Sequence, residues 1–170
     1  MMAPMRNHEH QLLVGRFTRV LDEVVTDANF GEVVPGVNVS DRVEGWESNY
    51  RVPDVAVFLK TTRAVNHDQF WHGGADFVVE IVSPHDQTRE KLGFYGAIGT
   101  RELLVVDRDP WRLELYRHDG NSLPQVSTSL VHDENWIISD VLGLKMCLEP
   151  DSVRPRIDVC HTASGRQWRI

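Results

Sequence analysis

The segment DFVVEIVSPHDQTREKLGFYGAIGTRELLVVD, residues 76–107, carries the strongest signals of the fold class. Asp76–Val82 is apolar on both faces, which is typical of a central strand covered by helices. Glu102–Asp107 is a second strand of the same kind. Between them, Ser83-Pro84 has the composition of a helix N-terminus, and a helix is expected from there to about Ile98. A strand, a helix and a strand in this order predict a parallel crossover.

The rest of the chain adds one long helix and several strands. His8–Val25 has apolar residues at helical spacing with charged residues on the opposite side, so it predicts an amphipathic helix. Tyr50–Leu59 predicts a strand with its proline near the start, and Lys60–Ala75 predicts a loop with one helical turn. Further strands are expected at Val37–Ser40, Arg112–Arg117, Gln125–Val131, Trp136–Ile138, Arg156–Cys160 and Gln167–Ile170, and the last two could pair with each other. The predicted fold class is α/β, with a mixed central sheet, flanking helices and extra strands toward the C-terminus.

Length and composition favour one domain. A chain of 170 residues with 41% hydrophobic content can bury a single core. We expect one domain over residues 1–170, with a core at about 8–149 and a β extension at about 150–170. Two scattered cysteines, Cys147 and Cys160, suit a reducing cytoplasm better than a disulfide framework. No apolar window approaches the length of a membrane span, so we expect a soluble cytoplasmic protein.

The formal net charge of −7 limits the classes of partner. Phosphate binding depends mainly on lysine and arginine, so this charge argues against a general coat protein of nucleic acids. A local contact with nucleic acid remains compatible with it.

Two acidic residues stand out because of their surroundings. Glu80 lies between Val79 and Ile81 in a predicted core strand, and Asp54 follows Pro53 at the start of another. A carboxylate that is buried without a partner costs several kcal/mol. Convergence of both acids on a divalent cation would explain the burial. Mg²⁺ suits such a site because it prefers oxygen ligands and typically takes one or two carboxylates while keeping several waters.

A lysine and a carbonyl complete the predicted site. Lys91 lies on the predicted helix that follows the Glu80 strand, so its long side chain could return toward Glu80. An ammonium group there can hold the attacking water and neutralise developing charge. The backbone carbonyl of Val82 is a candidate third metal ligand. Each residue also has a structural interpretation, since Asp54 could cap a loop and Lys91 could be an ordinary surface lysine. The loop histidines His67 and His72 are better read as solvated.

These motifs resemble a known family when they are read in order. They are Pro53-Asp54, Glu80-Ile81-Val82-Ser83-Pro84, Lys91-Leu92-Gly93-Phe94-Tyr95 and Gly99–Asp107. Together they resemble the Uma-type family of restriction endonucleases, within the PD-(D/E)xK nuclease superfamily, over about Gln11–Leu148. The resemblance implies a restriction-endonuclease-like core. It also implies that the catalytic lysine has moved from the position of Val82 to Lys91 on the following helix.

The resemblance implies further features of the site. His10 is expected to line it, and an acid of the first helix, either Glu9 or Glu23, is expected nearby. Arg89 and Tyr95 flank the lysine and are candidate contacts to phosphate.

The predicted function is therefore a Mg²⁺-dependent endonuclease, with Mn²⁺ as a possible substitute, that cleaves DNA and acts as a homodimer. In this reading Asp54 and Glu80 hold the metal and Lys91 is the catalytic lysine. The alternative is a catalytically silent protein that kept the nuclease fold as a dimeric interaction or nucleic-acid-binding module.

Overall fold

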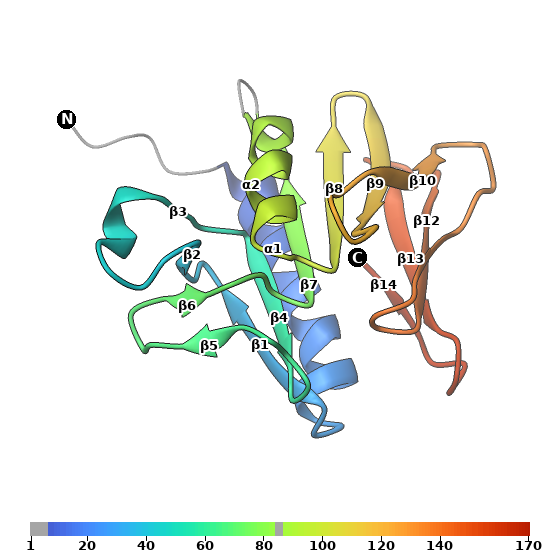
Figure 1. Ribbon diagram of the computed structural model, residues 1–170. Coiled ribbons are helices and arrows are strands. Elements are labelled where there is room, and N and C mark those ends of the chain that lie inside the picture. The colour runs from blue at the N-terminus through green and yellow to red at the C-terminus, as the bar shows by residue number, and fades with distance from the viewer. Residues whose placement is uncertain (1–6, 84–86) are drawn as a thin grey trace.

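The computed structural model describes residues 7–83 and 87–170, and a mixed six-stranded sheet forms its centre (Figure 1). Its only parallel pair among these residues is β7 with β8, and the other neighbouring strands are antiparallel. In spatial order the strands are β1 (Gly31–Pro35), β4 (Val55–Leu59), β7 (Phe77–Ile81), β8 (Glu102–Arg108), β9 (Trp111–Arg117) and β10 (Gln125–Leu130).

The two helices cover opposite faces of this sheet (Figure 1). On one face, α1 (His8–Leu21) continues as a short π-helix (Asp22–Thr26) and packs its apolar side against the sheet. On the other face lies α2 (Leu92–Ala97), preceded by a 3₁₀ turn, η3 (Thr88–Lys91). Alternate residues of the central strands therefore face different cores, as expected for strands buried on both sides.

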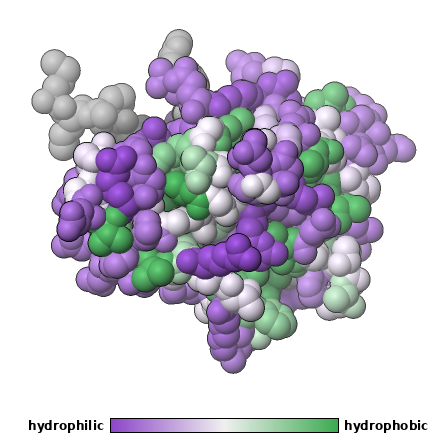
Figure 2. Space-filling model, viewed as in Figure 1, coloured by the Kyte–Doolittle hydropathy of each residue, from purple (hydrophilic) through white to green (hydrophobic). Residues whose placement is uncertain are grey.

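Two smaller sheets flank the large one. The first has the order β3 (Tyr50–Arg51), β2 (Val39–Ser40), β6 (Trp71–His72) and β5 (Val65–Asn66), with a 3₁₀ turn, η2 (Trp46–Ser48), beside it. The second is antiparallel and contains β11 (Ile137–Ser139), β12 (Leu144–Glu149), β13 (Arg156–His161) and β14 (Gln167–Arg169). Its apolar residues join α1 and the large sheet in one core cluster. Figure 2 shows small apolar patches set among hydrophilic residues on the viewed face.

The predicted fold class and the parallel crossover are confirmed, and several element predictions need correction. The strand expected at Tyr50–Leu59 is two strands, β3 and β4, on either side of Pro53. The loop expected at Lys60–Ala75 contains β5 and β6 and no helical turn. The helix expected from Ser83 to Ile98 is limited to η3 and α2 within the described residues, and Pro84 lies outside them. Neither β1 nor β12 was predicted. No helix of the described residues is long and apolar enough to cross a membrane.

Candidate functional site

The predicted site residues meet at one end of the central strands of the large sheet. Glu80 is near the C-terminal end of β7, and Asp54 directly precedes β4, which runs antiparallel to β7. Val55 pairs with Val79, so Asp54 and Glu80 are the next residues outward on neighbouring strands. Side chains in such positions have Cβ atoms about 5 Å apart. The sheet register therefore brings the two carboxylates into reach of a common ligand.

Asp54 is held by groups from two different elements. The residue is only 3% exposed, and its Oδ2 atom accepts a hydrogen bond of 2.8 Å from the Ile81 N–H. The Nε2 atom of His10, on α1, lies 3.2 Å from the same oxygen. Since an ionised carboxylate can only accept, Nε2 carries the hydrogen in this contact. His10 thus lies in the site, as the family resemblance implies, and ties the first turn of α1 to Asp54.

Glu80 has a cationic partner and a hydroxyl partner. It is 1% exposed, its Oε2 atom accepts from Lys91 Nζ at 3.3 Å, and its Oε1 atom accepts from the Tyr95 hydroxyl at 2.5 Å. The Lys91 side chain keeps 21% of its surface exposed. The ammonium group therefore returns to Glu80 from the following helical segment while still reaching solvent, which is the position expected for it from the sequence.

Tyr95 differs from its expected place. It was predicted to contact phosphate, but the residue is fully buried in α2 and its hydroxyl donates to Glu80. In this structure Tyr95 orients the carboxylate from below the surface and presents no exposed area to a substrate. Its four-residue spacing from Lys91 places both donors on one side of a helical segment, so that both reach Glu80.

The carbonyl of Val82 is occupied by an arginine that sequence reasoning missed. Arg108, the last residue of β8, donates from Nε and Nη2 to this oxygen at 3.2 and 3.1 Å. Its Nη1 atom donates to Asn7 Oδ1 and to Glu9 Oε2, both at 3.0 Å. Metal ligation by the Val82 carbonyl stays a prediction, and it requires Arg108 to shift. The sequence signal that could have identified Arg108 is its place at the end of a predicted buried strand.

The two candidate acids of the first helix lie in different places. Glu9 is next to the site, through its ion pair with Arg108. Glu23 lies in the short π-helix that follows α1. It accepts a hydrogen bond from Trp168 Nε1 of β14 and forms an ion pair with Arg166, away from the site. The structure therefore favours Glu9 as the acid of the first helix nearest to the site.

The donor set of the site is small. Within residues 7–83 and 87–170, no group of three or more histidine, cysteine, aspartate or glutamate side chains could hold a metal ion. Two buried carboxylates, Asp54 and Glu80, form the acidic part of the site instead. This set suits a hard cation such as Mg²⁺, which keeps several waters and needs only one or two carboxylates.

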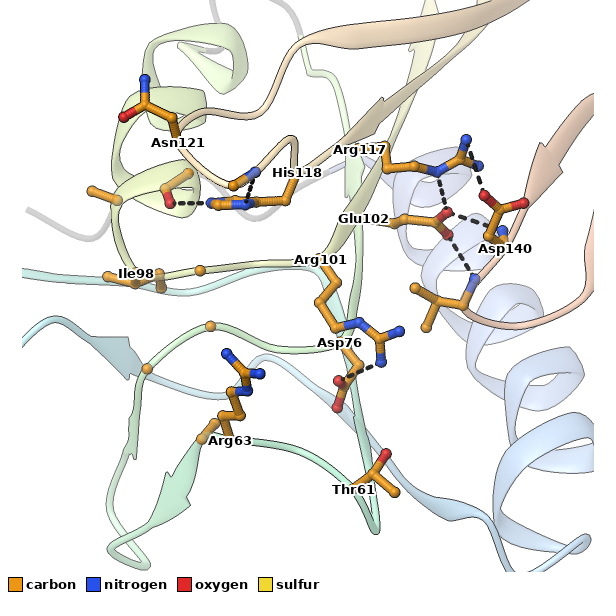
Figure 3. Close-up of a pocket in the computed structure, with 18 residues that line it drawn as sticks. Thr61, Arg63, Asp76, Ile98, Arg101, Glu102, Arg117, His118, Asn121 and Asp140 are labelled. Carbon is orange, nitrogen blue, oxygen red and sulfur yellow. Dashed lines mark hydrogen bonds and ion pairs between the residues drawn. The ribbon is translucent and has the colours of Figure 1, made fainter.

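A large cavity lies at the opposite end of the central strands (Figure 3). Its volume is about 1020 Å³, and the starts of β7 and β8 contribute Asp76, Arg101 and Glu102 to its wall. The charges there are paired, since Arg101 binds Asp76 at 3.1 Å and Arg117 binds Glu102 at 2.8 Å. None of the predicted site residues lines this cavity, so cavity size alone would have pointed away from them.

Removal of the Tyr95 hydroxyl is expected to lower stability measurably. In Tyr95→Phe a buried charged acceptor loses a short hydrogen bond, and such bonds contribute roughly 1.5–3 kcal/mol. We expect the free energy of unfolding in urea to fall by about that amount without metal. Tyr50→Phe, at a tyrosine that is 40% exposed, serves as the control and should change little. Equal unfolding free energies for Tyr95→Phe and the wild type would show that the contact is unimportant.

Comparison with known proteins supports a nuclease fold. The Uma2 family model, described as "Putative restriction endonuclease", matches residues 1–150. The structure resembles the crystal structure of a "putative nuclease" from Anabaena variabilis ATCC 29413, with a TM-score of 0.61. That match has 18% sequence identity and covers 84% of this chain and 78% of the other, and at such identity it shows the fold alone. The comparison with curated proteins found no match.

Proposed function

The chain belongs to the Uma2 family, whose model is described as "Putative restriction endonuclease", and we propose that it is a Mg²⁺-dependent endonuclease that hydrolyses phosphodiester bonds of DNA. One observation carries the proposal. Two buried carboxylates, Asp54 and Glu80, lie at adjacent strand ends, and the Lys91 ammonium is 3.3 Å from Glu80. The family match supports the nuclease class, and the local geometry supports the assignment of these residues.

The metal would be held by Asp54 and Glu80, with the Val82 carbonyl as a further ligand once Arg108 has moved. When bound, Mg²⁺ or Mn²⁺ supplies charge neutralisation at the phosphate and a more acidic bound water. Both residues fit this role because they offer carboxylate oxygens. Hydrogen bonds hold the carboxylates in place, such as the one from the Ile81 N–H to Asp54. Outer partners of this kind orient metal ligands and tune their affinity.

Lys91 is the residue that we propose acts on the reacting groups. Its ammonium group has three N–H donors, one of which points to Glu80, so the others can bind the attacking water or a phosphate oxygen. In the hydrolysis, water forms one new P–O bond while the bond to the leaving oxygen breaks, and that oxygen takes up a proton. Positive charge next to the phosphate stabilises the negative charge that develops in this step. Arg89, two residues before Lys91, is a candidate contact to phosphate.

The assembly and the location follow from the same proposal. Cutting both strands of a duplex usually requires two active sites, so we propose that the protein acts as a homodimer. Both cysteines are free and buried, which fits the proposed reducing cytoplasm.

Calorimetry of metal binding tests the proposal directly. Wild-type protein should bind Mg²⁺ or Mn²⁺, and Asp54→Asn should weaken binding by at least about 10- to 100-fold, because even supporting partners of ligands have effects of that size. Asp76→Asn is the matched control, since Asp76 is an equally buried acid at the other end of β7. The control should bind metal like the wild type.

A cleavage assay on supercoiled plasmid and on single-stranded DNA completes the test. We expect metal-dependent cleavage by the wild type and none by Asp54→Asn. Unchanged metal binding in Asp54→Asn would refute the assigned site. Metal binding without any cleavage would instead favour a catalytically silent protein that kept the fold.

A further inference from the structure

A cluster of two arginines and two acids lies beside the candidate site, and we call it the paired-arginine cluster. Its members are Arg89 of η3, Asp107 of β8, and Arg112 and Glu114 of β9. The two carboxylates are nearly buried, whereas the Arg89 and Arg112 side chains are 41% and 36% exposed. The acids therefore lie underneath and the guanidinium groups lie at the surface.

Hydrogen bonds and ion pairs hold both guanidinium groups in place. Arg89 Nη2 donates to Asp107 Oδ2 and to Glu114 Oε1, both at 2.8 Å. Arg112 Nη2 lies 3.3 Å from Asp107 Oδ2, and its Nε lies 2.8 Å from Glu114 Oε1. Tyr116 donates its hydroxyl to the other oxygen of Glu114 at 2.6 Å. Both arginine side chains are thus ordered before any ligand binds. Binding then loses less side-chain conformational entropy.

The charges of Asp107 and Arg89 persist at neutral pH. Burial opposes ionisation of Asp107, but the hydrogen bonds from Arg89 and from the Asp109 N–H, with the charges of Arg89 and Arg112, hold its pKa below the ordinary value. Hydrogen bonds to Glu114 and then Asp107 raise the pKa of Arg89. Burial, followed by the bond to Glu114, raises the pKa of Tyr116 to about 12, so its hydroxyl stays a donor.

The register of the sheet gives the distance from the cluster to the candidate site. Glu80 pairs with Val105 of β8, and Val105 pairs with Glu114 of β9, so the three residues form one row across the sheet. Two strand spacings separate Glu80 from Glu114, which is about 10 Å. The phosphates of one strand of a B-form duplex follow each other at about 3.4 Å along the axis. If the phosphate that is cleaved lies at Glu80, a phosphate a few nucleotides along the same DNA strand would therefore lie near the paired-arginine cluster.

We propose that Arg89 and Arg112 form a docking site for a flanking phosphate of the substrate strand. The inference rests on the proposed endonuclease function and deepens it, because it makes the substrate a chain with a phosphate beyond the cleaved one. Each guanidinium group has five N–H donors in a fork that matches phosphate oxygens, and the acids below engage only some of them. Arg112, which sequence reasoning did not single out, completes the site around Arg89.

Wild-type protein can test the site without any substitution. A fluorescent DNA oligonucleotide is titrated with protein in a set of versions, each with one phosphate replaced by a neutral methylphosphonate. Besides the phosphate at the metal site, we expect one flanking position at which neutralisation weakens binding about fivefold to tenfold. The slope of log affinity against log salt should also become shallower by about 0.7–0.9 for that version.

A double-mutant cycle then assigns that position to the cluster. In Arg112→Gln, binding of unmodified DNA should weaken, and neutralising the flanking phosphate should have a smaller effect than in the wild type, because only Arg89 then contacts that phosphate. Arg19→Gln, at an exposed arginine of α1 on the other face of the sheet, is the control and should leave both responses intact. Circular dichroism confirms that each variant is folded.

The outcomes separate this inference from the proposed function. Metal-dependent cleavage by the wild type, together with equal effects of the flanking methylphosphonate on wild type and Arg112→Gln, would overturn the docking site and leave the endonuclease intact. The same conclusion follows if no flanking position matters. A wild type that neither binds nor cleaves DNA would overturn both.

Discussion

Substitution of Lys91 by methionine is expected to lower the single-turnover rate of metal-dependent DNA cleavage by about 100- to 1000-fold, the usual cost of removing one group that stabilises developing charge. Methionine keeps most of the length and apolar area of the lysine while removing its charge and donors. The Lys91 ammonium group lies 3.3 Å from Glu80 and reaches solvent, so it is placed to serve both the site and an incoming phosphate.

A structural role for Lys91 must be separated from a chemical one. Loss of the ammonium also leaves the buried Glu80 with fewer partners, which lowers stability whether or not Lys91 takes part in catalysis. Unfolding in urea measures that effect, and calorimetry reports whether metal still binds. Lys60→Met is the control, because Lys60 is exposed and its ammonium group donates to Asn29, away from the site.

The decisive comparison is at saturating metal and DNA, with a folded variant. A rate close to that of the wild type would show that the Lys91–Glu80 contact is purely structural. If instead Lys91→Met and Glu80→Gln each slow cleavage strongly and their combination costs no more than either, the two residues act as one unit.

The central part of the fold could be predicted because its signals are local. The run Phe77–Ile81 is buried on both of its faces, and a central strand is the element that accommodates this pattern. The connection that follows is long enough for a crossover and has a helical pattern, which favours a parallel return, and β8 provides it. Arg156–Cys160 and Gln167–Ile170 were likewise predicted as strands that could pair, and β13 pairs with β14.

Other elements depended on distant partners. In β1, Gly31 and Pro35 resemble turn residues, and the strand exists because it pairs with all of β4. Within the described residues, the helix after β7 is shorter than predicted. Its interior includes Gly93 and Gly96, each of which costs about 1 kcal/mol relative to alanine. Local composition could not show β1, whereas the two glycines were a local signal for the shorter helix.

The same distinction applies to the candidate site. Lys91 could be related to Glu80 because the two residues are joined by a short segment of chain. Arg108 and Arg112 could not, since their partners depend on the register between β7, β8 and β9. The contact between His10 and Asp54 spans 44 residues and was not predicted. The family resemblance led only to the expectation that His10 lines the site.

Glu102→Ala is expected to destabilise the protein by roughly 1.5–3 kcal/mol or more, because a buried charged acceptor is lost and the buried donors that it served are left without it. Glu102, the first residue of β8, is 1% exposed. It accepts from Arg117 Nε at 2.8 Å, from the Ser139 hydroxyl at 2.5 Å and from the Asp140 N–H at 2.9 Å. One carboxylate thus joins the large sheet to the start of the C-terminal sheet.

Urea denaturation with two further variants identifies which contacts matter. Glu102→Gln keeps one acceptor oxygen, so it can accept from Ser139 or from the Asp140 N–H but not from both, and it has no charge for Arg117. We therefore expect a loss of stability, smaller than that of Glu102→Ala. Glu32→Ala, at an exposed acid of β1, should stay within about 0.5 kcal/mol of the wild type. Because Glu102 lies at the opposite end of β8 from Arg108, metal affinity in the folded Glu102 variants should be unchanged. A loss below about 1 kcal/mol in Glu102→Ala would mean that the apolar core, rather than this carboxylate, holds the two sheets together.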